Sequence, residues 1–166
     1  MNVTLRAETA ADISSIEALT VAAFLHAPHT SHTEQHIVNA LRQAGRLTLS
    51  LIAEVERRVI GHVALSPVSI SDGACGWFGL GPICVLPELQ RQGTGTQLMR
   101  AALQELRAQG AAGCVVLGEP AYYGRFGFRH EPALVLPGVA AEYFQALAFD
   151  APLPKGIVQY DSAFSL

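Results

Sequence analysis

Two glycines separated by one residue, Gly93 and Gly95, mark the stretch VLPELQRQGTGTQLM, which covers residues 85–99 and passes into a helical pattern. Glycine lets a backbone take positive φ and approach a ligand closely. The first amides of a helix lack intrahelical partners and point outward with the positive end of the helix dipole. The stretch is therefore interpreted either as a phosphate or pyrophosphate site, with Arg91 adding charge at its rim, or as a tight turn alone.

Two common phosphate motifs do not fit this stretch. A P-loop requires Lys followed by Ser or Thr directly after its second glycine, whereas Gly95 is followed by Thr-Gln. The dinucleotide fingerprint requires three glycines at the start of a Rossmann sheet, whereas this pair comes late in the chain, after predicted antiparallel strands. Both motifs are therefore excluded.

Cysteines and histidines are the other residues that could carry chemistry. The three cysteines are widely spaced, which is typical of neither a disulfide framework nor a zinc site, so they are interpreted as reduced packing residues. Four histidines fall within eleven residues, and the last two are spaced i, i+4 on a predicted helix, as in some metal sites. No carboxylate completes the usual zinc helix motif, so no metal is predicted. The residues concerned are Cys75, Cys84, Cys114, His26, His29, His32 and His36.

The composition predicts one globular domain over residues 1–166, because half of the residues are hydrophobic and only 15% are charged. A net charge of -3 and a pI near 6 provide no broad basic surface, so no nucleic-acid partner is expected. The N-terminus lacks a signal-peptide pattern, and no apolar run reaches the roughly 18 residues of a membrane span. We therefore expect a cytoplasmic protein without membrane association.

Periodicity predicts the elements that would position these residues. A strand over residues 2–8 precedes a helix that begins near Thr9 and Asp12, and Ser31 with Glu34 forms a capping box for a second helix. Residues 47–55 and 59–70 then alternate as an antiparallel hairpin.

The second half of the chain predicts a parallel unit. Residues 76–85 read as a strand in which Pro82 indicates a bulge or a departure from the neighbouring strand. A helix over residues 94–109 and a buried strand over 113–118 complete a βαβ unit, so the fold class is α+β. A short helix near residues 119–128 and a last strand near 155–164 follow.

The pattern Val85-x-Pro87-x-x-Gln90-Arg91-x-Gly93-x-Gly95 resembles the acetyl-CoA signature of the GNAT superfamily of N-acetyltransferases. The segment YYGRFGF is similar to that family's later Tyr-x-x-x-Gly-Phe element, and the resemblance covers roughly residues 3–130. Residues 131–166 are similar to the tails of a little-characterised bacterial subgroup. The resemblance implies a mixed, mainly antiparallel sheet of about seven strands with a splayed central pair and flanking helices.

The resemblance also implies a cofactor, acetyl-CoA, and the residues that hold it. Backbone amides of the glycine turn would bind the pyrophosphate, and the backbone of the splayed strand would bind the pantetheine arm and the thioester carbonyl. The turn residues are Arg91, Gln92, Gly93, Thr94, Gly95 and Thr96, and the strand residues are Ile83, Cys84 and Val85.

An amine that attacks a thioester needs a general acid for the departing thiolate and a general base for the incoming ammonium. The resemblance places Tyr123 as the acid, with Tyr122 as its rival. The base stays open between Glu119, His62 and water, because the strand near Pro82 lacks the glutamate that some family members carry. A nucleophilic role for Cys84 would need a neighbouring base, and none is evident.

The resemblance implies an N-acetyltransferase that moves an acetyl group to a primary amine by direct attack in a ternary complex. The alternative is a non-catalytic acyl-CoA-binding sensor or regulatory module. The acceptor would be a small amine or a peptide or protein amine, and the protein would be a monomer or a homodimer. Because the family's acceptor site borders the segment between the first two helices, changing His29 and His32 should alter acceptor affinity but not acetyl-CoA affinity.

Overall fold

The structure is a computed structural model that describes residues 2–28 and 30–165. Its centre is a six-stranded sheet of order β1-β2-β3-β5-β6-β8, in which β5 and β6 are parallel and all other neighbours are antiparallel. The strands are β1 (Thr4–Ala7), β2 (Leu49–Val55), β3 (Arg58–Pro67), β5 (Trp77–Val85), β6 (Gly113–Leu117) and β8 (Phe144–Ala148). The predicted mixed, mainly antiparallel sheet is confirmed.

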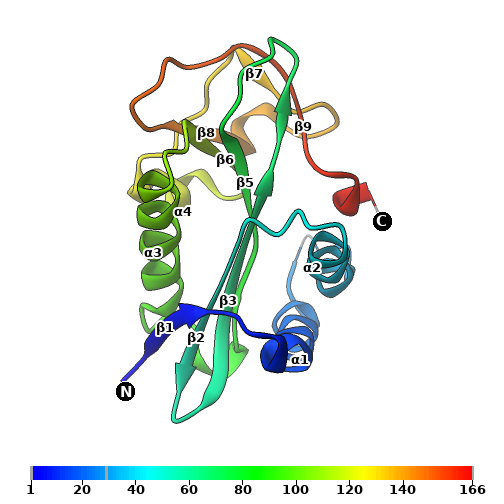
Figure 1. Ribbon diagram of the computed structural model, residues 1–166, viewed down its shortest axis with the longest axis vertical. Helices are drawn as coiled ribbons and strands as arrows, with labels where there is room; N and C mark the ends of the chain where they lie inside the picture. Colours follow the sequence, from blue (N-terminus) through cyan, green and yellow to red (C-terminus); the bar gives the residue numbers. More distant parts are fainter. Residues whose placement is uncertain (1, 29, 166) are drawn as a thin grey trace.

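Helices cover both faces of this sheet. In Figure 1, α1 and α2 lie on one side of the strands and α3 lies on the other. The α-helices are α1 (Ile13–Phe24), α2 (Glu34–Gln43), α3 (Thr94–Ala108) and α4 (Pro120–Tyr123), and the 3₁₀ turns are η1 (Ala10–Asp12), η2 (Pro87–Leu89), η3 (Gly124–Phe126), η4 (Ala141–Tyr143) and η5 (Ser162–Ser165). None of the helices within the described ranges is long and apolar enough to cross a bilayer.

The packing of α3 follows from its periodicity. Its apolar residues fall on one stripe that faces the sheet, and Leu98, Met99 and Leu106 are fully buried there. Burial of a side chain of this size stabilises the fold by roughly 1.5–3 kcal/mol. The stripe therefore fixes the helix on the sheet and with it the position of the glycine turn at its N-terminus.

The starts of the first two helices differ in how well the sequence predicted them. At η1, the Asp12 carboxylate accepts a hydrogen bond from the Thr9 amide at 2.7 Å, as predicted, and two more from Arg6 at 2.8 and 2.9 Å. The prediction for α2 was wrong in register, because the helix begins at Glu34 with Thr33 as its cap. Ser31 still donates to Glu34, but from outside the helix.

A second, three-stranded sheet of order β4-β9-β7 was not predicted. It consists of β4 (Ser69–Ile70), β9 (Gly156–Gln159) and β7 (Leu134–Val135), and it lies beyond the β6 and β8 end of the main sheet (Figure 1). The predicted last strand is β9, which joins this small sheet, while β8 of the main sheet had no assignment. The strands therefore divide into six and three, in place of about seven in one sheet.

The central pair of the main sheet splays apart at the predicted place. Parallel pairing of β5 with β6 runs from Trp77 to Gly79, although β5 continues to Val85 along β3. The register of β3 against β5 shifts where Gly81 and Pro82 fall, because Pro82 has no N–H to donate. Beyond Gly79, one edge of β5 therefore faces a gap between the strands.

Candidate active site

The first cavity lies between the end of β5 and the start of α3 and has a volume of about 600 Å³. It is lined by the backbone and side chains of Ile83, Cys84, Val85, Leu89, Gln90, Arg91, Gly93, Thr94, Gly95, Thr96, Tyr122 and Arg125. Eight of the nine residues predicted to bind a cofactor belong to this list. The ninth, Gln92, is exposed and lies in the same turn without lining the cavity.

The two glycines of the turn serve different purposes. Gly93 caps α3 with a φ of 89°, in the left-handed region that glycine adopts without strain. Gly95 lies inside the helix and is not among the residues with positive φ. A Cβ at Gly95 would lie 3.2 Å from the Tyr122 Oη, on the wall of the cavity. The missing side chain at Gly95 therefore lets another group come close to the helix backbone, whereas Gly93 allows the left-handed backbone conformation at the helix start.

Two further features of the first cavity suit an anion. The Thr94 hydroxyl is buried without a hydrogen-bond partner among the described residues, directly at the start of α3. The Arg125 guanidinium lies 3.3 Å from the Thr96 Oγ1 and 5.2 Å from the centre of the Tyr122 ring. Arg125 was not predicted from the sequence, where its only signal is its place inside the YYGRFGF segment.

The second cavity lies on the other side of the splay, has a volume of about 760 Å³, and shares Ile83 with the first. Its walls come from α1, α2, β5, the end of β6, α4, residues 136–139 and the C-terminal segment, residues 157–165. It is lined by Phe24, Glu34, Ile37, Leu80, Gly81, Pro82, Ile83, Leu117, Tyr123, Leu136, Pro137, Val139, Ile157, Val158, Gln159, Tyr160, Asp161, Ser162, Phe164 and Ser165. The two cavities therefore meet at the splayed strand.

The adjacent tyrosines are divided between the cavities. Tyr122 lines the first and Tyr123 lines the second, with their rings edge to face at 5.0 Å between centroids. The Tyr123 ring also packs edge to face on Phe128 at 6.1 Å. Burial raises the pKa of Tyr123 to about 12, so its hydroxyl stays protonated near neutral pH and is available as a donor.

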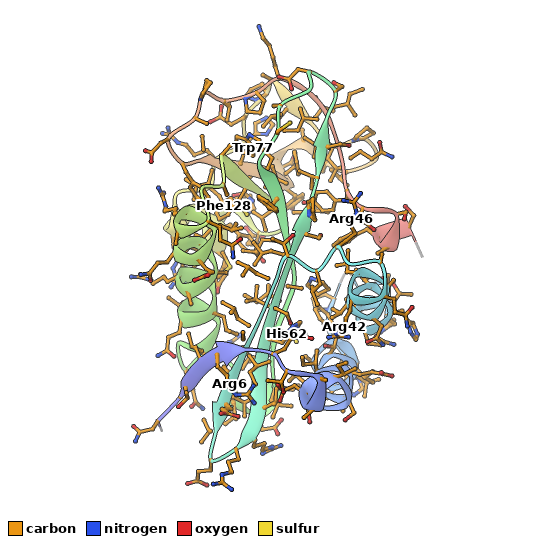
Figure 2. All side chains as sticks on the ribbon, in the orientation of Figure 1. Arg6, Arg42, Arg46, His62, Trp77 and Phe128 are labelled. Carbon is orange, nitrogen blue, oxygen red and sulfur yellow. The ribbon has the colours of Figure 1, made fainter. Side chains whose placement is uncertain are left out.

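His62 and Glu119, the two side chains considered as general bases, line neither cavity. His62 is buried on β3, and its Nε2 lies 2.7 Å from the Ser50 Oγ, which in turn donates to Glu8. Arg42 closes this network with two hydrogen bonds to Glu8, at 2.9 and 2.8 Å. Figure 2 shows Arg42 and His62 on the α1 and α2 side of the sheet. Glu119 is exposed at the start of α4.

Burial lowers the pKa of His62 to about 4, outweighing the nearby Glu8 charge, so the unfolded chain binds the proton first as the pH falls below about 6.5. Stability should therefore be lost between about pH 6.5 and pH 4, by roughly 2 kcal/mol at pH 4.5 relative to pH 7. Urea unfolding of the wild type and of His62→Gln at both pH values measures this difference. Equal losses in the two proteins would contradict the assignment.

The described histidines of residues 26–36 lie near the second cavity without lining it. His26, His32 and His36 are exposed, and His29 lies outside the described residues. Phe24, which precedes His26, and Glu34, which lies between His32 and His36, both line the cavity. Within residues 2–28 and 30–165, no group of three His, Cys, Asp or Glu side chains is placed to hold a metal ion.

The three cysteines are free thiols. Burial raises the pKa of Cys84 to about 12, and its Sγ lies 4.0 Å from the Thr20 Oγ1 on α1. A thiol with such a pKa is a poor nucleophile near neutral pH. This environment opposes a covalent route through Cys84.

Comparison with known proteins identifies relatives of this site and fold. Residues 47–130 match the family model described as an acetyltransferase (GNAT) domain. The chain is 36% identical over 168 aligned positions to the uncharacterised N-acetyltransferase YhbS of Escherichia coli K12, covering 97% of this chain and 98% of YhbS.

Two solved structures of relatives contain a ligand. A GNAT family acetyltransferase from Brucella melitensis, in complex with acetyl-CoA, is 45% identical with a TM-score of 0.87, and 98% of each chain is covered. E. coli YhbS in complex with CoA is 32% identical with a TM-score of 0.89, covering all of this chain and 93% of the other. With a family model over half of its length and relatives along nearly all of it, the chain belongs to the GNAT family of N-acetyltransferases.

Proposed function

We propose that this enzyme binds acetyl-CoA in the first cavity and transfers its acetyl group to a primary amine in the second cavity. The observation that carries the proposal is that Ile83, on a splayed strand whose pairing with β6 ends at Gly79, lines both cavities. The relatives crystallised with acetyl-CoA and with CoA support it. Direct attack in a ternary complex needs both substrates side by side, and this arrangement provides two adjoining compartments.

The residues of the first cavity fit a pyrophosphate-bearing cofactor. The left-handed turn at Gly93 and the missing Cβ at Gly95 leave room for an anion at the start of α3, whose amides and dipole favour it. The buried Thr94 hydroxyl supplies a further donor, and Arg91 and Arg125 supply positive charge. The bound acetyl-CoA supplies a thioester, which is the activated acyl group of the reaction.

The free edge of β5 would hold the pantetheine arm and the thioester carbonyl. Beyond Gly79, this edge has no ladder partner on β6, so backbone groups between Ile83 and Val85 can bond an extended ligand as a missing strand would. The Gln90 side-chain amide already donates from its Nε2 to the Val85 carbonyl at 3.1 Å, which helps to fix this strand end. An amide aimed at the developing oxyanion is worth roughly 10²- to 10³-fold in rate.

Proton transfer would use Tyr123 and water. Tyr123 lines the second cavity, and its hydroxyl would protonate the departing thiolate as the carbon–sulfur bond breaks. Because His62 and Glu119 line neither cavity, we assign the proton of the incoming ammonium to water in the second cavity. No enzyme side chain then forms a covalent intermediate.

Calorimetry with acetyl-CoA, followed by thiol release in the presence of amines, peptides and polyamines, tests the proposed function. We expect acetyl-CoA binding and release of free coenzyme A that depends on an amine. Binding without turnover for every acceptor would favour the non-catalytic sensor. Absence of acetyl-CoA binding would refute the proposal altogether.

The position of the Tyr123 ring can be tested without changing Tyr123. A Cβ at Gly118 would lie 2.4 Å from the Tyr123 Cε2, so Gly118→Ala must displace the ring. We expect kcat to fall by about fivefold to tenfold with unchanged acetyl-CoA affinity, since small misplacements of reacting groups are costly. Gly124→Ala is the matched control, because that residue has helical φ and no atom within 4 Å of the added Cβ. Equal kcat for the two variants would contradict the assigned role.

A further inference from the structure

The charged side chains that line the second cavity are both acidic, Glu34 and Asp161. Asp161 is already engaged: its Oδ2 lies 3.5 Å from the Arg46 Nε, and its Oδ1 accepts the Ala163 amide at 3.0 Å. Figure 2 shows Arg46 beside the C-terminal turn. Glu34 takes part in none of the ion pairs formed by the described side chains. The negative charge left for a ligand is therefore that of Glu34.

Neutral donors hold the Glu34 carboxylate in place. The Thr30 hydroxyl lies 2.7 and 2.8 Å from its two oxygens, and the Ser31 amide and hydroxyl each donate at 3.2 Å. Partial burial opposes ionisation, but these hydrogen bonds outweigh it and hold the pKa of Glu34 below its usual value. The carboxylate is therefore an anion held in one orientation, with no ion-pair partner among the side chains of residues 2–28 and 30–165.

The charge of Glu34 also acts on the splayed strand. Burial is the main reason that the pKa of Cys84 is raised, and the nearby Glu34 charge raises it further. Cys84 belongs to the β5 segment where the two cavities meet. Glu34 and Ile83 line the same cavity, so a cation bound by Glu34 would share that cavity with the strand segment assigned to the thioester.

The rest of the second cavity is mainly apolar. Its walls include Phe24, Leu80 and Leu136, and two of its residues expose much of their apolar surface, Leu117 at 43% and Ile157 at 53%. A ligand that covers this surface would remove it from water, which is favourable in proportion to the area buried. The cavity therefore combines an extended apolar wall with one carboxylate that has no ion-pair partner among the described side chains.

We propose that the acceptor is a primary amine with a single positive charge, joined by a short chain to an aromatic or branched aliphatic body. Glu34 binds the incoming ammonium, the apolar wall binds the body, and the amine becomes nucleophilic when its proton leaves to water. The assignment rests on the proposed function. A polyamine would place further charges, and a peptide would place amide groups, on a wall whose polar side chains other than Glu34 and Tyr123 are confined to residues 159–165. Glu34 and residues 157–165 lie outside the matched range 47–130, whereas Leu80 and Leu117 of the apolar wall lie inside it.

The test uses the protein saturated with coenzyme A, titrated by calorimetry with 2-phenylethylamine, 2-phenylethanol, ethylamine and spermidine. We expect 2-phenylethylamine to bind at least about tenfold more tightly than the other three, because it alone has both one charge and an apolar body. Glu34→Gln should weaken 2-phenylethylamine by about tenfold and leave 2-phenylethanol unchanged. In the transfer assay the same substitution should raise KM for the amine much more than it changes kcat.

Glu105→Gln is the matched control, because it removes the same charge from the exposed face of α3, away from both cavities. Equal binding of the amine and the alcohol, tighter binding of spermidine, no binding of any probe, or an unchanged KM in Glu34→Gln would overturn the assignment of the acceptor. Failure of the proposed function would be a different result, namely no binding of acetyl-CoA by the wild-type protein.

Discussion

Gly95→Val is expected to lose coenzyme A binding while the protein stays folded. The first added carbon would lie 3.2 Å from the Tyr122 Oη, and the two branches of valine would extend into the first cavity. They would occupy the place where the amides of α3 are proposed to meet the pyrophosphate. Crowding of this kind typically costs 1–3 kcal/mol, so we expect affinity for coenzyme A to fall by roughly 10- to 100-fold or more. Calorimetry with coenzyme A measures the change.

Ala108→Val is the matched control for this substitution. It adds the same β-branched side chain to the exposed last turn of the same helix, far from the first cavity. Circular dichroism and thermal unfolding should show that both variants fold. Wild-type affinity in a folded Gly95→Val protein would refute the assignment of the pyrophosphate to this turn.

Tyr123→Phe is expected to lower kcat by at least about tenfold with almost unchanged acetyl-CoA affinity. A thiol has an unperturbed pKa near 8.5, so a thiolate expelled near neutral pH gains from receiving a proton as its bond breaks. Help from a general acid is typically worth roughly 10²- to 10⁴-fold. With its pKa raised to about 12, the Tyr123 hydroxyl is protonated near neutral pH and therefore carries a proton when the thiolate leaves. Steady-state kinetics with an identified acceptor and calorimetry with acetyl-CoA measure the two effects separately.

Tyr122→Phe serves as the control because it removes the same atom from the adjacent residue, which lines the first cavity. We expect it to change kcat much less. Turnover by Tyr123→Phe at the wild-type rate would exclude this residue as the acid. A larger loss in Tyr122→Phe than in Tyr123→Phe would transfer the role to its rival.

Local signals in the sequence were enough for much of the scaffold. The spacing of Leu98, Met99 and Leu106 predicts a helix with one buried stripe, because periodicity depends on residues that are near in the chain. Pro82 predicts the break in strand pairing for an equally local reason, since it has no N–H wherever it stands. The predicted cofactor turn is likewise a contiguous segment, and its residues other than Gln92 line one cavity.

The acceptor side depended on contacts between distant segments, and from the sequence only the segment between the first two helices was expected to border it. Glu34 was predicted only as a capping residue, and it became a cavity anion because α2 packs beside β5 and the C-terminal segment closes the far wall. Tyr122 and Tyr123 look equivalent in the sequence, and the turn of α4 at the splay sends them into different cavities. His62 lost its candidacy as a base because the same fold buries it against Ser50. Periodicity and turn residues determine where helices, strands and turns form. The surroundings of a side chain depend on which distant helices and strands pack together.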